Sequence, residues 1–262
     1  MAELGNKVAF LTGANRGIGR VTALTLASAG AQLVLAGRDL PGLEETARLI
    51  GQTHEATPPL ICQLDLLDPS TIQASVMSAI DSFGRIDVLI NNAGITGKAV
   101  PLWELADAEW DATINTNLKG PFLVSRAVIP FMLKEKSGSI IFIGSVTGKR
   151  PFKNRSAYAA SKLGLVGMMR TLALELGPHK IRVNLISPGF VAGPRLEGVF
   201  ENVAESENIS LPDARARMRE MIPQDEFVSP ENISQGVLFL ASDRSAGITG
   251  EDLNISGGLV MY

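Results

Sequence analysis

The chain has 262 residues, with a hydrophobic share of 45%, a charged share of 19% and a formal net charge of -3. These are globular values, and the mild acidity argues against a nucleic-acid binder or a polybasic membrane protein. The start lacks the pattern of a signal peptide, and no uncharged run reaches the ~20 residues that span a bilayer, so we expect a cytoplasmic protein with small-molecule partners.

Short β-rich apolar runs alternate with longer helical patterns along almost the whole chain. The predicted strands are Val8–Thr12, Gln32–Ala36, Leu60–Gln63, Val88–Asn91, Ser139–Ile143, Arg182–Ile186 and Asp252–Ile255. The predicted helices are Gly17–Ala29, Pro41–Ile50, Pro69–Phe83, Ala106–Lys136 with a break, Ser156–Leu176 and Pro230–Ala241. This alternation indicates βαβ units, so we predict one α/β domain over residues 1–262, with a parallel sheet covered on both faces.

Residues 188–230 form the one irregular region. The segment is too long for an ordinary connection and contains one predicted short helix, Leu211–Met221. Long insertions in compact domains are often binding loops or lids. We therefore expect this segment to cover the substrate.

A glycine-rich turn joins the first predicted strand to the first helix, with the sequence Thr12-Gly13-Ala14-Asn15-Arg16-Gly17-Ile18-Gly19. Glycines allow a tight turn and a close approach of the backbone to a ligand. The helix N-terminus then offers free N–H groups and a positive dipole end to a diphosphate. The spacing differs from the commoner G-x-G-x-x-G fingerprint, but strand, glycines and helix follow in the order that a nucleotide site requires.

A second polar constellation follows the fifth predicted strand. Ser145 ends an apolar run, and the next helix presents Tyr158 and Lys162 one turn apart on the same face. A fixed cation near a phenol favours the phenolate and brings its pKa toward working pH. Taken alone, the pair also fits a solvated helix face. One cysteine and two histidines supply no metal-ligand cluster, so we expect no metal.

Three motifs in this order, TGxxxGIG at Thr12–Gly19, NNAG at Asn91–Gly94 and YxxxK at Tyr158 and Lys162, resemble the short-chain dehydrogenase/reductase family over nearly the whole chain. The resemblance implies a Rossmann-like, doubly wound sheet of seven strands in three layers. It also implies that the protein binds NAD or NADP and transfers a hydride between nicotinamide and a carbonyl or secondary alcohol. Members are commonly tetramers, so we expect a homotetramer or homodimer.

The resemblance places cofactor contacts at strand ends and the loops after them. These residues are Gly13, Asn15, Arg16, Gly17, Ile18, Gly19, Arg38, Asp39, Asp65, Leu66, Asn92, Ala93, Gly94, Tyr158, Lys162, Pro188, Gly189 and Val191. Where members that prefer NAD usually carry an acid, this chain has Gly37, followed by Arg38. Arg16 and Arg38 can clamp a 2′-phosphate, which favours NADP. Alternatively, Arg38 stacks on adenine while Asp39 accepts from the ribose of NAD.

Two assignments in the cofactor site carry a second interpretation. Asp65 matches an adenine-side contact but fits equally a cap for the helix after Pro69. Gly193 stands where members often have a threonine that bonds the nicotinamide carboxamide, and backbone groups of Val191 are the expected replacement.

The resemblance assigns catalysis to Asn117, Ser145, Tyr158 and Lys162. Ser145 donates to the substrate oxygen, and Tyr158 transfers the proton. Lys162 lowers the pKa of Tyr158 and bonds the nicotinamide ribose. The Asn117 side chain, with a helix irregularity, holds a water that relays protons to Lys162.

Basic residues crowd the loop between Ser145 and Tyr158, namely Lys149, Arg150, Lys153 and Arg155, and Arg195 follows the sixth strand. They predict an acidic substrate such as a carboxylate, phosphate or acyl thioester, or else a solvated or subunit-interface cluster. The leading function is an NADP-dependent reductase of the 3-oxoacyl reductase type. The alternatives are an NAD-dependent polyol or sugar dehydrogenase and a non-catalytic NAD(P)-sensing scaffold.

Overall fold

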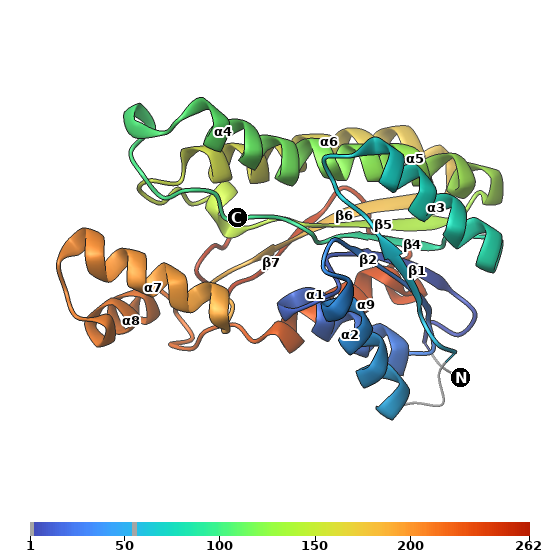
Figure 1. Ribbon diagram of the computed structural model, residues 1–262, viewed down its shortest axis with the longest axis horizontal. Helices are drawn as coiled ribbons and strands as arrows, with labels where there is room; N and C mark the ends of the chain where they lie inside the picture. The colour runs from blue at the N-terminus through green and yellow to red at the C-terminus, as the bar shows by residue number, and fades with distance from the viewer. Residues whose placement is uncertain (1–2, 54–56) are drawn as a thin grey trace.

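The computed structural model describes residues 3–53 and 57–262. Within these residues the strands are β1 (Val8–Thr12), β2 (Gln32–Gly37), β3 (Leu60–Gln63), β4 (Val88–Asn91), β5 (Gly138–Ile143), β6 (Ile181–Pro188) and β7 (Asp252–Ile255). All pair in parallel in one seven-stranded sheet of order β3-β2-β1-β4-β5-β6-β7 (Figure 1). The predicted doubly wound sheet is confirmed, with small changes at strand ends.

Helices cover both faces of the sheet (Figure 1). One layer contains α1 (Gly17–Ser28), α2 (Leu40–Thr53) and α9 (Pro230–Ala241), and the other contains α3 (Pro69–Phe83), α4 (Asp107–Ile114), α5 (Gly120–Glu135) and α6 (Ser156–Leu176). Short 3₁₀ turns lie at Leu102–Glu104, Val146–Gly148, Gly177–His179 and Asp243–Ser245. None of the helices in the described ranges is long and apolar enough to cross a membrane.

The strand sequences explain why both faces are covered. In β1, Val8 and Phe10 join the apolar cluster under α3, α5 and α6, whereas Ala9 and Leu11 join the cluster under α1, α2 and α9. Successive side chains of a strand point to opposite faces, so an unbroken apolar run needs a helical layer on each side. Because the buried strands all run parallel, their carboxyl ends lie at one edge of the sheet, and the polar loops that follow them emerge there.

The predicted break in the long helix between Ala106 and Lys136 is a π turn. Residues Asn115–Lys119 form this wider turn between α4 and α5, with Asn117 fully buried. Such turns interrupt the regular backbone ladder and are frequent at functional sites. The irregularity therefore places an amide side chain inside the protein at a defined point.

The segment 188–230 is more regular than predicted. Besides α8 (Leu211–Glu220) it contains α7 (Pro194–Glu207), which the sequence analysis missed. The two helices share their own apolar cluster, apart from the two main ones, built on Leu196, Phe200 and Met218. They project beyond the sheet at one end of the molecule (Figure 1). We refer to residues 193–227 as the α7–α8 arm.

Candidate active site

The glycine turn and the NNAG segment meet at the carboxyl ends of β1 and β4. The Thr12 hydroxyl accepts from the N–H groups of Asn92 (3.0 Å) and Ala93 (3.1 Å). The Asn92 side chain donates to the carbonyls of Thr12 (2.9 Å) and Gly13 (3.1 Å). In the sheet, β2 lies on one side of β1 and β4 lies on the other, so the strand order changes direction at β1. Open α/β sheets bind ligands at such a switch point.

The glycines of the turn have different functions. A Cβ on Gly19 would lie 2.0 Å from the Gly13 carbonyl oxygen, and one on Gly13 would lie 3.0 Å from Ala93 Cα, so these two allow packing. Gly17 has a φ of 52° and faces open space. Its neighbour Arg16 makes no side-chain cap to α1, so the first N–H groups of the helix remain available. The open backbone at Gly17 fits a diphosphate.

The adenosine end of the predicted site holds two acids in different settings. Asp39 accepts from the Asn15 side chain (2.9 Å) and the Gly42 N–H (3.1 Å), and these bonds, the Asn15 bond first, lower its pKa. Asp65 lies 3.8 Å from the guanidinium of Arg38, whose side chain is 68% exposed. Arg38 is therefore free to turn toward a ligand.

Two sequence interpretations change near the start of α3. The Asp68 side chain caps this helix through the Ser70 N–H, while Asp65 accepts from the Leu67 N–H. The interpretation of Asp65 as the cap is therefore wrong. The buried Leu66 side chain packs so closely on Gly120 that a Cβ there would lie 2.8 Å from it. Leu66 is thus limited to backbone contacts with a cofactor.

Ser145, Tyr158 and Lys162 are brought together by β5 and α6. Lys162 Nζ donates to the Ile143 carbonyl (2.8 Å), two residues before Ser145, and lies 5.8 Å from the centre of the Tyr158 ring. The Ser145 oxygen accepts from the Thr147 N–H (3.1 Å), so its own hydrogen remains free to donate. A hydroxyl donor, a phenol and an ammonium therefore share one edge of the sheet.

Lys162 is almost fully buried, with 6% exposure. Burial, and then the positive charge of Arg195, lower the pKa of Lys162 from 10.5 to about 7. Gly94 makes room for it, since a Cβ on Gly94 would lie 3.6 Å from Nζ and 3.0 Å from Asn117 Oδ1. The protein thus keeps a cation out of water beside the NNAG segment, where an anion would favour its charged form.

The Asn117 side chain fastens the chain that follows Gly94. Its oxygen accepts from the Ile95 N–H (2.8 Å), and its nitrogen donates to the Ile95 carbonyl (2.9 Å) and the Ser161 hydroxyl (3.2 Å). We expected this side chain to hold a relay water. The bonds make the amide a clamp between the π turn, α6 and the NNAG segment, and the relay water stays a prediction.

The basic residues after Ser145 do not act together. Lys149 forms a buried pair with Asp252 (2.9 Å), and Arg150 donates to the Leu259 carbonyl (3.0 Å), so both hold the C-terminal segment. Lys153 is exposed. Arg155 donates to the Thr96 carbonyl (3.3 Å), and burial lowers its pKa while the nearby Tyr158 raises it. We expected some of these cations to border the active site, and the contacts of Lys149 and Arg150 with the C-terminal segment leave Lys153 and Arg155 as the candidates.

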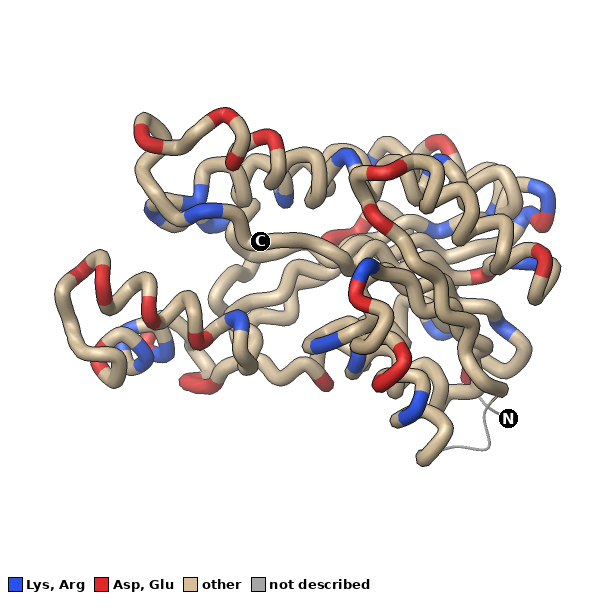
Figure 2. Tube along the Cα trace, in the orientation of Figure 1, with Lys and Arg blue, Asp and Glu red and all other residues tan. Residues whose placement is uncertain are grey.

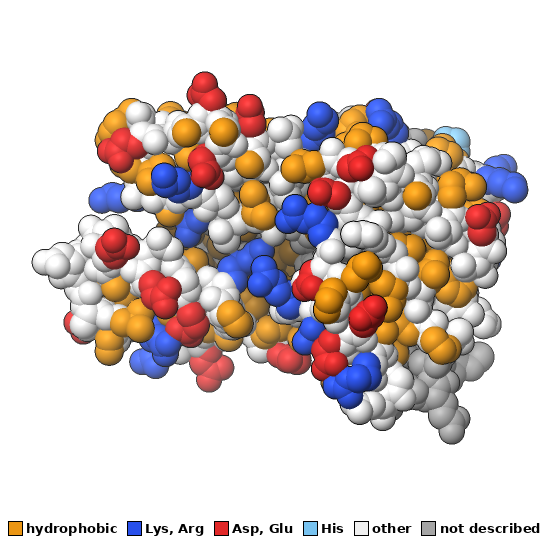
Figure 3. Space-filling view, viewed as in Figure 1, with side chains coloured by type: hydrophobic (Ala, Val, Ile, Leu, Met, Phe, Trp, Pro, Cys, Tyr) orange, Lys and Arg blue, Asp and Glu red, His pale blue; other side chains and the backbone are white. Residues whose placement is uncertain are grey.

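Arg195 approaches the NNAG segment from the arm. Its guanidinium donates to the Gly94 carbonyl at 2.8 Å. Arg195 and Arg155 therefore bind the same short loop at carbonyls two residues apart. Figure 3 shows Lys and Arg side chains gathered around the hollow between the arm and the rest of the molecule.

An apolar wall next to Ser145 was not foreseen from the sequence. Val146 packs with a cluster that also contains Phe152, Phe190, Met221, Leu259 and Val260. The rings of Phe152 and Phe190 are 5.6 Å apart. The available signal was position, because Phe152 lies between the two predicted catalytic stretches and Phe190 follows β6.

The loop after β6 holds Pro188, Gly189 and Val191 near the same edge. A Cβ on Gly189 would lie 2.8 Å from Ser256 Cα, so this glycine allows close packing. Val191 pairs with Val228 in a parallel bridge whose hydrogen bonds use Phe190 and Ala192. In a parallel pair the groups of the central residue then point away from its partner. The backbone groups of Val191 are therefore not used in this bridge, and the carboxamide contact stays a prediction.

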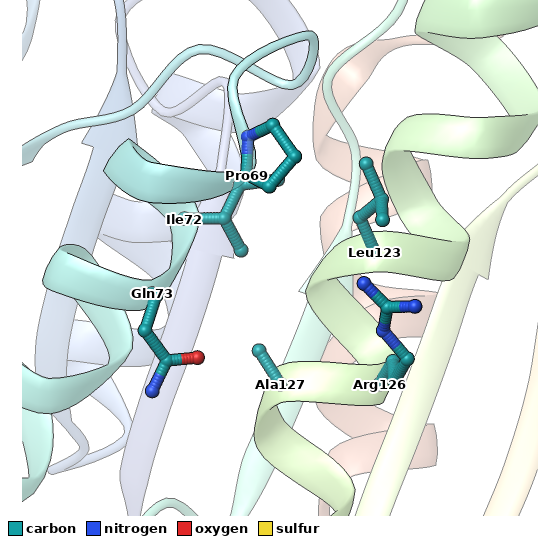
Figure 4. Close-up of a pocket in the computed structure, with 6 residues that line it drawn as sticks. All are labelled: Pro69, Ile72, Gln73, Leu123, Arg126 and Ala127. Carbon is teal, nitrogen blue, oxygen red and sulfur yellow. The ribbon is translucent and has the colours of Figure 1, made fainter.

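A small pocket elsewhere carries none of these residues. It lies between α3 and α5 and is lined by Pro69, Ile72, Gln73, Leu123, Arg126 and Ala127 (Figure 4). Among the residues that the structure describes, no group of His, Cys, Asp and Glu is placed to hold a metal ion.

Known proteins share both the sequence and the fold. The family model described as Enoyl-(Acyl carrier protein) reductase matches residues 13–260. The 3-oxoacyl-[acyl-carrier-protein] reductase FabG of Thermotoga maritima is 39% identical over 99% of this chain and 100% of its own. The FabG protein of Escherichia coli is 35% identical over 97% of this chain and 98% of its own. Levodione reductase has a TM-score of 0.93 at 34% identity, covering 97% and 98% of the two chains. The structure of NAD⁺-bound xylitol dehydrogenase has a TM-score of 0.92 at 29% sequence identity, covering 98% of this chain and 100% of its own.

The fold, the glycine turn and these relatives define an NAD(P)-dependent oxidoreductase that acts on CH–OH groups and carbonyls. The chain belongs to the short-chain dehydrogenase/reductase family. The predicted family and enzyme class are therefore confirmed.

Proposed function

We propose that the protein reduces the keto group of a 3-oxoacyl thioester with NADPH. The observation that carries this proposal is the partly exposed pair of Phe152 and Phe190, which packs with Val146, the residue after Ser145, whose hydroxyl hydrogen is free to donate. An acyl chain lies against such a wall while its keto oxygen reaches the hydroxyl. The names of the relatives from T. maritima and E. coli support the same substrate class.

In this proposal the bound nicotinamide supplies the hydride. Ser145 donates a hydrogen bond to the keto oxygen and stabilises the charge that develops there. Tyr158 gives that oxygen its proton, and Lys162 favours the resulting phenolate. Asn117 holds the Ile95 segment and α6 in register, so that these groups keep their relative positions. The open backbone of Gly17 and the N-terminus of α1 hold the diphosphate.

The choice of NADP rests on Arg16 and Arg38. Both lie near the predicted ribose end, and a 2′-phosphate accepts charge-assisted bonds from guanidinium groups. The ion pair between Arg38 and Asp65 favours the second candidate, an NAD-dependent polyol dehydrogenase, because it compensates part of that charge. The Michaelis constants for NADPH and NADH distinguish the two candidates. A preference for NADH above about tenfold contradicts the 2′-phosphate clamp of Arg16 and Arg38.

The substrate is tested with a matched panel. Short and long 3-oxoacyl thioesters, neutral ketones and polyols are assayed with both cofactors by the absorbance of the reduced nicotinamide. Activity that grows with acyl length supports the apolar wall as the acyl site. Turnover restricted to polyols with NAD supports the second candidate instead.

Assembly and location belong to the same proposal. Leu163 and Leu174 are 52% and 81% exposed on α6, and Met261 and Tyr262 are 77% and 79% exposed at the C-terminal end. If both apolar areas are subunit interfaces, the protein forms a homotetramer. If only one of them is an interface, it forms a homodimer. Light scattering after size-exclusion chromatography measures the mass. We place the protein in the cytoplasm, which cell fractionation tests.

A further inference from the structure

Arg195 joins two parts of the molecule that are far apart in the chain. It is the second residue of α7, and its Nη2 donates to the Gly94 carbonyl at 2.8 Å. Within the described residues, the ion pairs involve other basic side chains and leave Arg195 without a carboxylate partner. The guanidinium thus holds the α7–α8 arm by a neutral acceptor only.

Gly94 lies on the path that a bound dinucleotide must follow. One end of that path is the open backbone of Gly17, and the other is Tyr158 with Lys162. Ala93 packs against Gly13 of the turn, and Gly94 lies next to Lys162 Nζ. A ligand that extends from α1 to Tyr158 therefore passes the place where Arg195 is bonded.

The two helices of the arm pack on each other, and Met221 and Gln224 join the end of the arm to the C-terminal segment. Leu196, Phe200 and Met218 form its own apolar cluster, so its two helices support one another. The chain enters and leaves the arm at Val191 and Val228, which pair with each other. Gly193, directly before α7, has a φ of 135° and no heavy atom near its missing side chain. Backbone rotation at Gly193 is therefore sterically open and can reorient the first turn of α7, which carries Arg195.

Charge balance gives Arg195 a better partner than a carbonyl. The diphosphate of a dinucleotide is negatively charged, and a guanidinium binds phosphate oxygens in a bidentate way. Of the nearby cations, Arg38 lies beside Asp65, and burial lowers the pKa of Lys162 to about 7. Arg195 has no carboxylate partner among the described residues, so its guanidinium can exchange a carbonyl for a phosphate without breaking an ion pair.

We propose that Arg195 exchanges the Gly94 carbonyl for the diphosphate of the bound dinucleotide, and thereby couples cofactor binding to the position of the α7–α8 arm. Arg195 is then a positioning residue for the cofactor. This inference rests on the dinucleotide site of the proposed function and is independent of the acyl substrate.

The first test measures binding by calorimetry for the wild type, Arg195→Met, Arg195→Lys and the control Arg217→Met, which removes the same charge from α8. The ligands are NADPH and 2′,5′-ADP, the fragment without the nicotinamide nucleotide. NADH and AMP replace them if the protein prefers NAD. We expect Arg195→Met to weaken NADPH roughly tenfold or more, and 2′,5′-ADP clearly less, because this fragment keeps only one of the two phosphates of the diphosphate. Arg195→Lys restores part of the affinity, and Arg217→Met changes neither ligand.

Unchanged or tighter NADPH binding in Arg195→Met would overturn the proposal, because Arg195 would then only block the cleft. Equal weakening of both ligands overturns it too, since that pattern means general damage. Neither readout needs turnover, so inactivity on 3-oxoacyl thioesters disproves the substrate and leaves the exchange standing. A protein that binds neither dinucleotide disproves both.

The second test follows the arm by amide hydrogen exchange. Without cofactor, the α7 amides of Arg195→Met should exchange faster than those of the wild type, because the bond to Gly94 is lost. NADPH should slow exchange in α7 of the wild type more than in the variant. Equal exchange in both proteins, with and without NADPH, contradicts the coupling.

Discussion

Replacing Lys162 with methionine removes a charge that folding takes out of water. In the cofactor-free protein, burial lowers the pKa of this ammonium from 10.5 to about 7. Between these pH values the unfolded chain keeps a proton on Lys162 that the folded protein has released. The free energy of unfolding must therefore rise with pH across this window, because the unfolded state binds more protons.

One proton corresponds to a slope of roughly 1.4 kcal/mol per pH unit, and the whole pKa difference to roughly 5 kcal/mol. Urea unfolding from about pH 7 to about pH 9 gives the slope for the wild type, Lys162→Met and the exposed control Lys134→Met. We expect Lys134→Met to follow the wild type, and Lys162→Met to be less pH-dependent by up to the slope above. Parallel curves for all three proteins refute the reasoning, since Lys162 would then titrate alike in both states.

Three further substitutions test other parts of the site. Tyr158→Phe should lower turnover by ~100-fold or more while leaving NADPH affinity unchanged, and retention of about a tenth of the rate removes Tyr158 from proton transfer. Gly19→Ala should cost about 3 kcal/mol in urea unfolding, because its Cβ meets the Gly13 carbonyl, whereas Gly17→Ala should cost roughly 1–2 kcal/mol and weaken NADPH binding. Equal affinity in Gly17→Ala and wild type argues against the diphosphate at this turn. Phe152→Ala should raise KM for long 3-oxoacyl thioesters more than for short ones, and an equal change for both lengths contradicts the apolar wall.

The sheet and most helices were predictable because their signals are local. Each strand of the parallel sheet is an unbroken apolar run, and the helices start at signals such as Asp68-Pro69 and Ser229-Pro230, where the side chains do cap α3 and α9. The α7 helix was missed although it carries similar marks. Pro194 stands at its first turn, and Leu196, Phe200 and Val203 recur at helical spacing. Gly198 and the acidic residues between these apolar positions weaken the helical pattern.

The contacts that define the site are less accessible to sequence reasoning. Motifs bring Ser145, Tyr158 and Lys162 together in expectation, because β5 and α6 are neighbours in the chain. The bond between Arg195 and Gly94 spans 101 positions and depends on how the arm lies over the sheet edge. Likewise, the pair of Lys149 with Asp252 turns a loop cation toward β7, which no local pattern indicates.

The hydrogen bonds of Thr12 and Asn92 have a mechanical consequence. They hold the glycine turn and the NNAG segment together, so this side of the cofactor site is rigid. The α7–α8 arm lies on the other side and would change position in the exchange that we propose for Arg195. Grip on the dinucleotide and choice of substrate are thereby divided between two bodies. Replacing the α7–α8 arm by a different one that keeps Arg195 should therefore change the substrate, while the glycine turn and the NNAG segment still bind the cofactor.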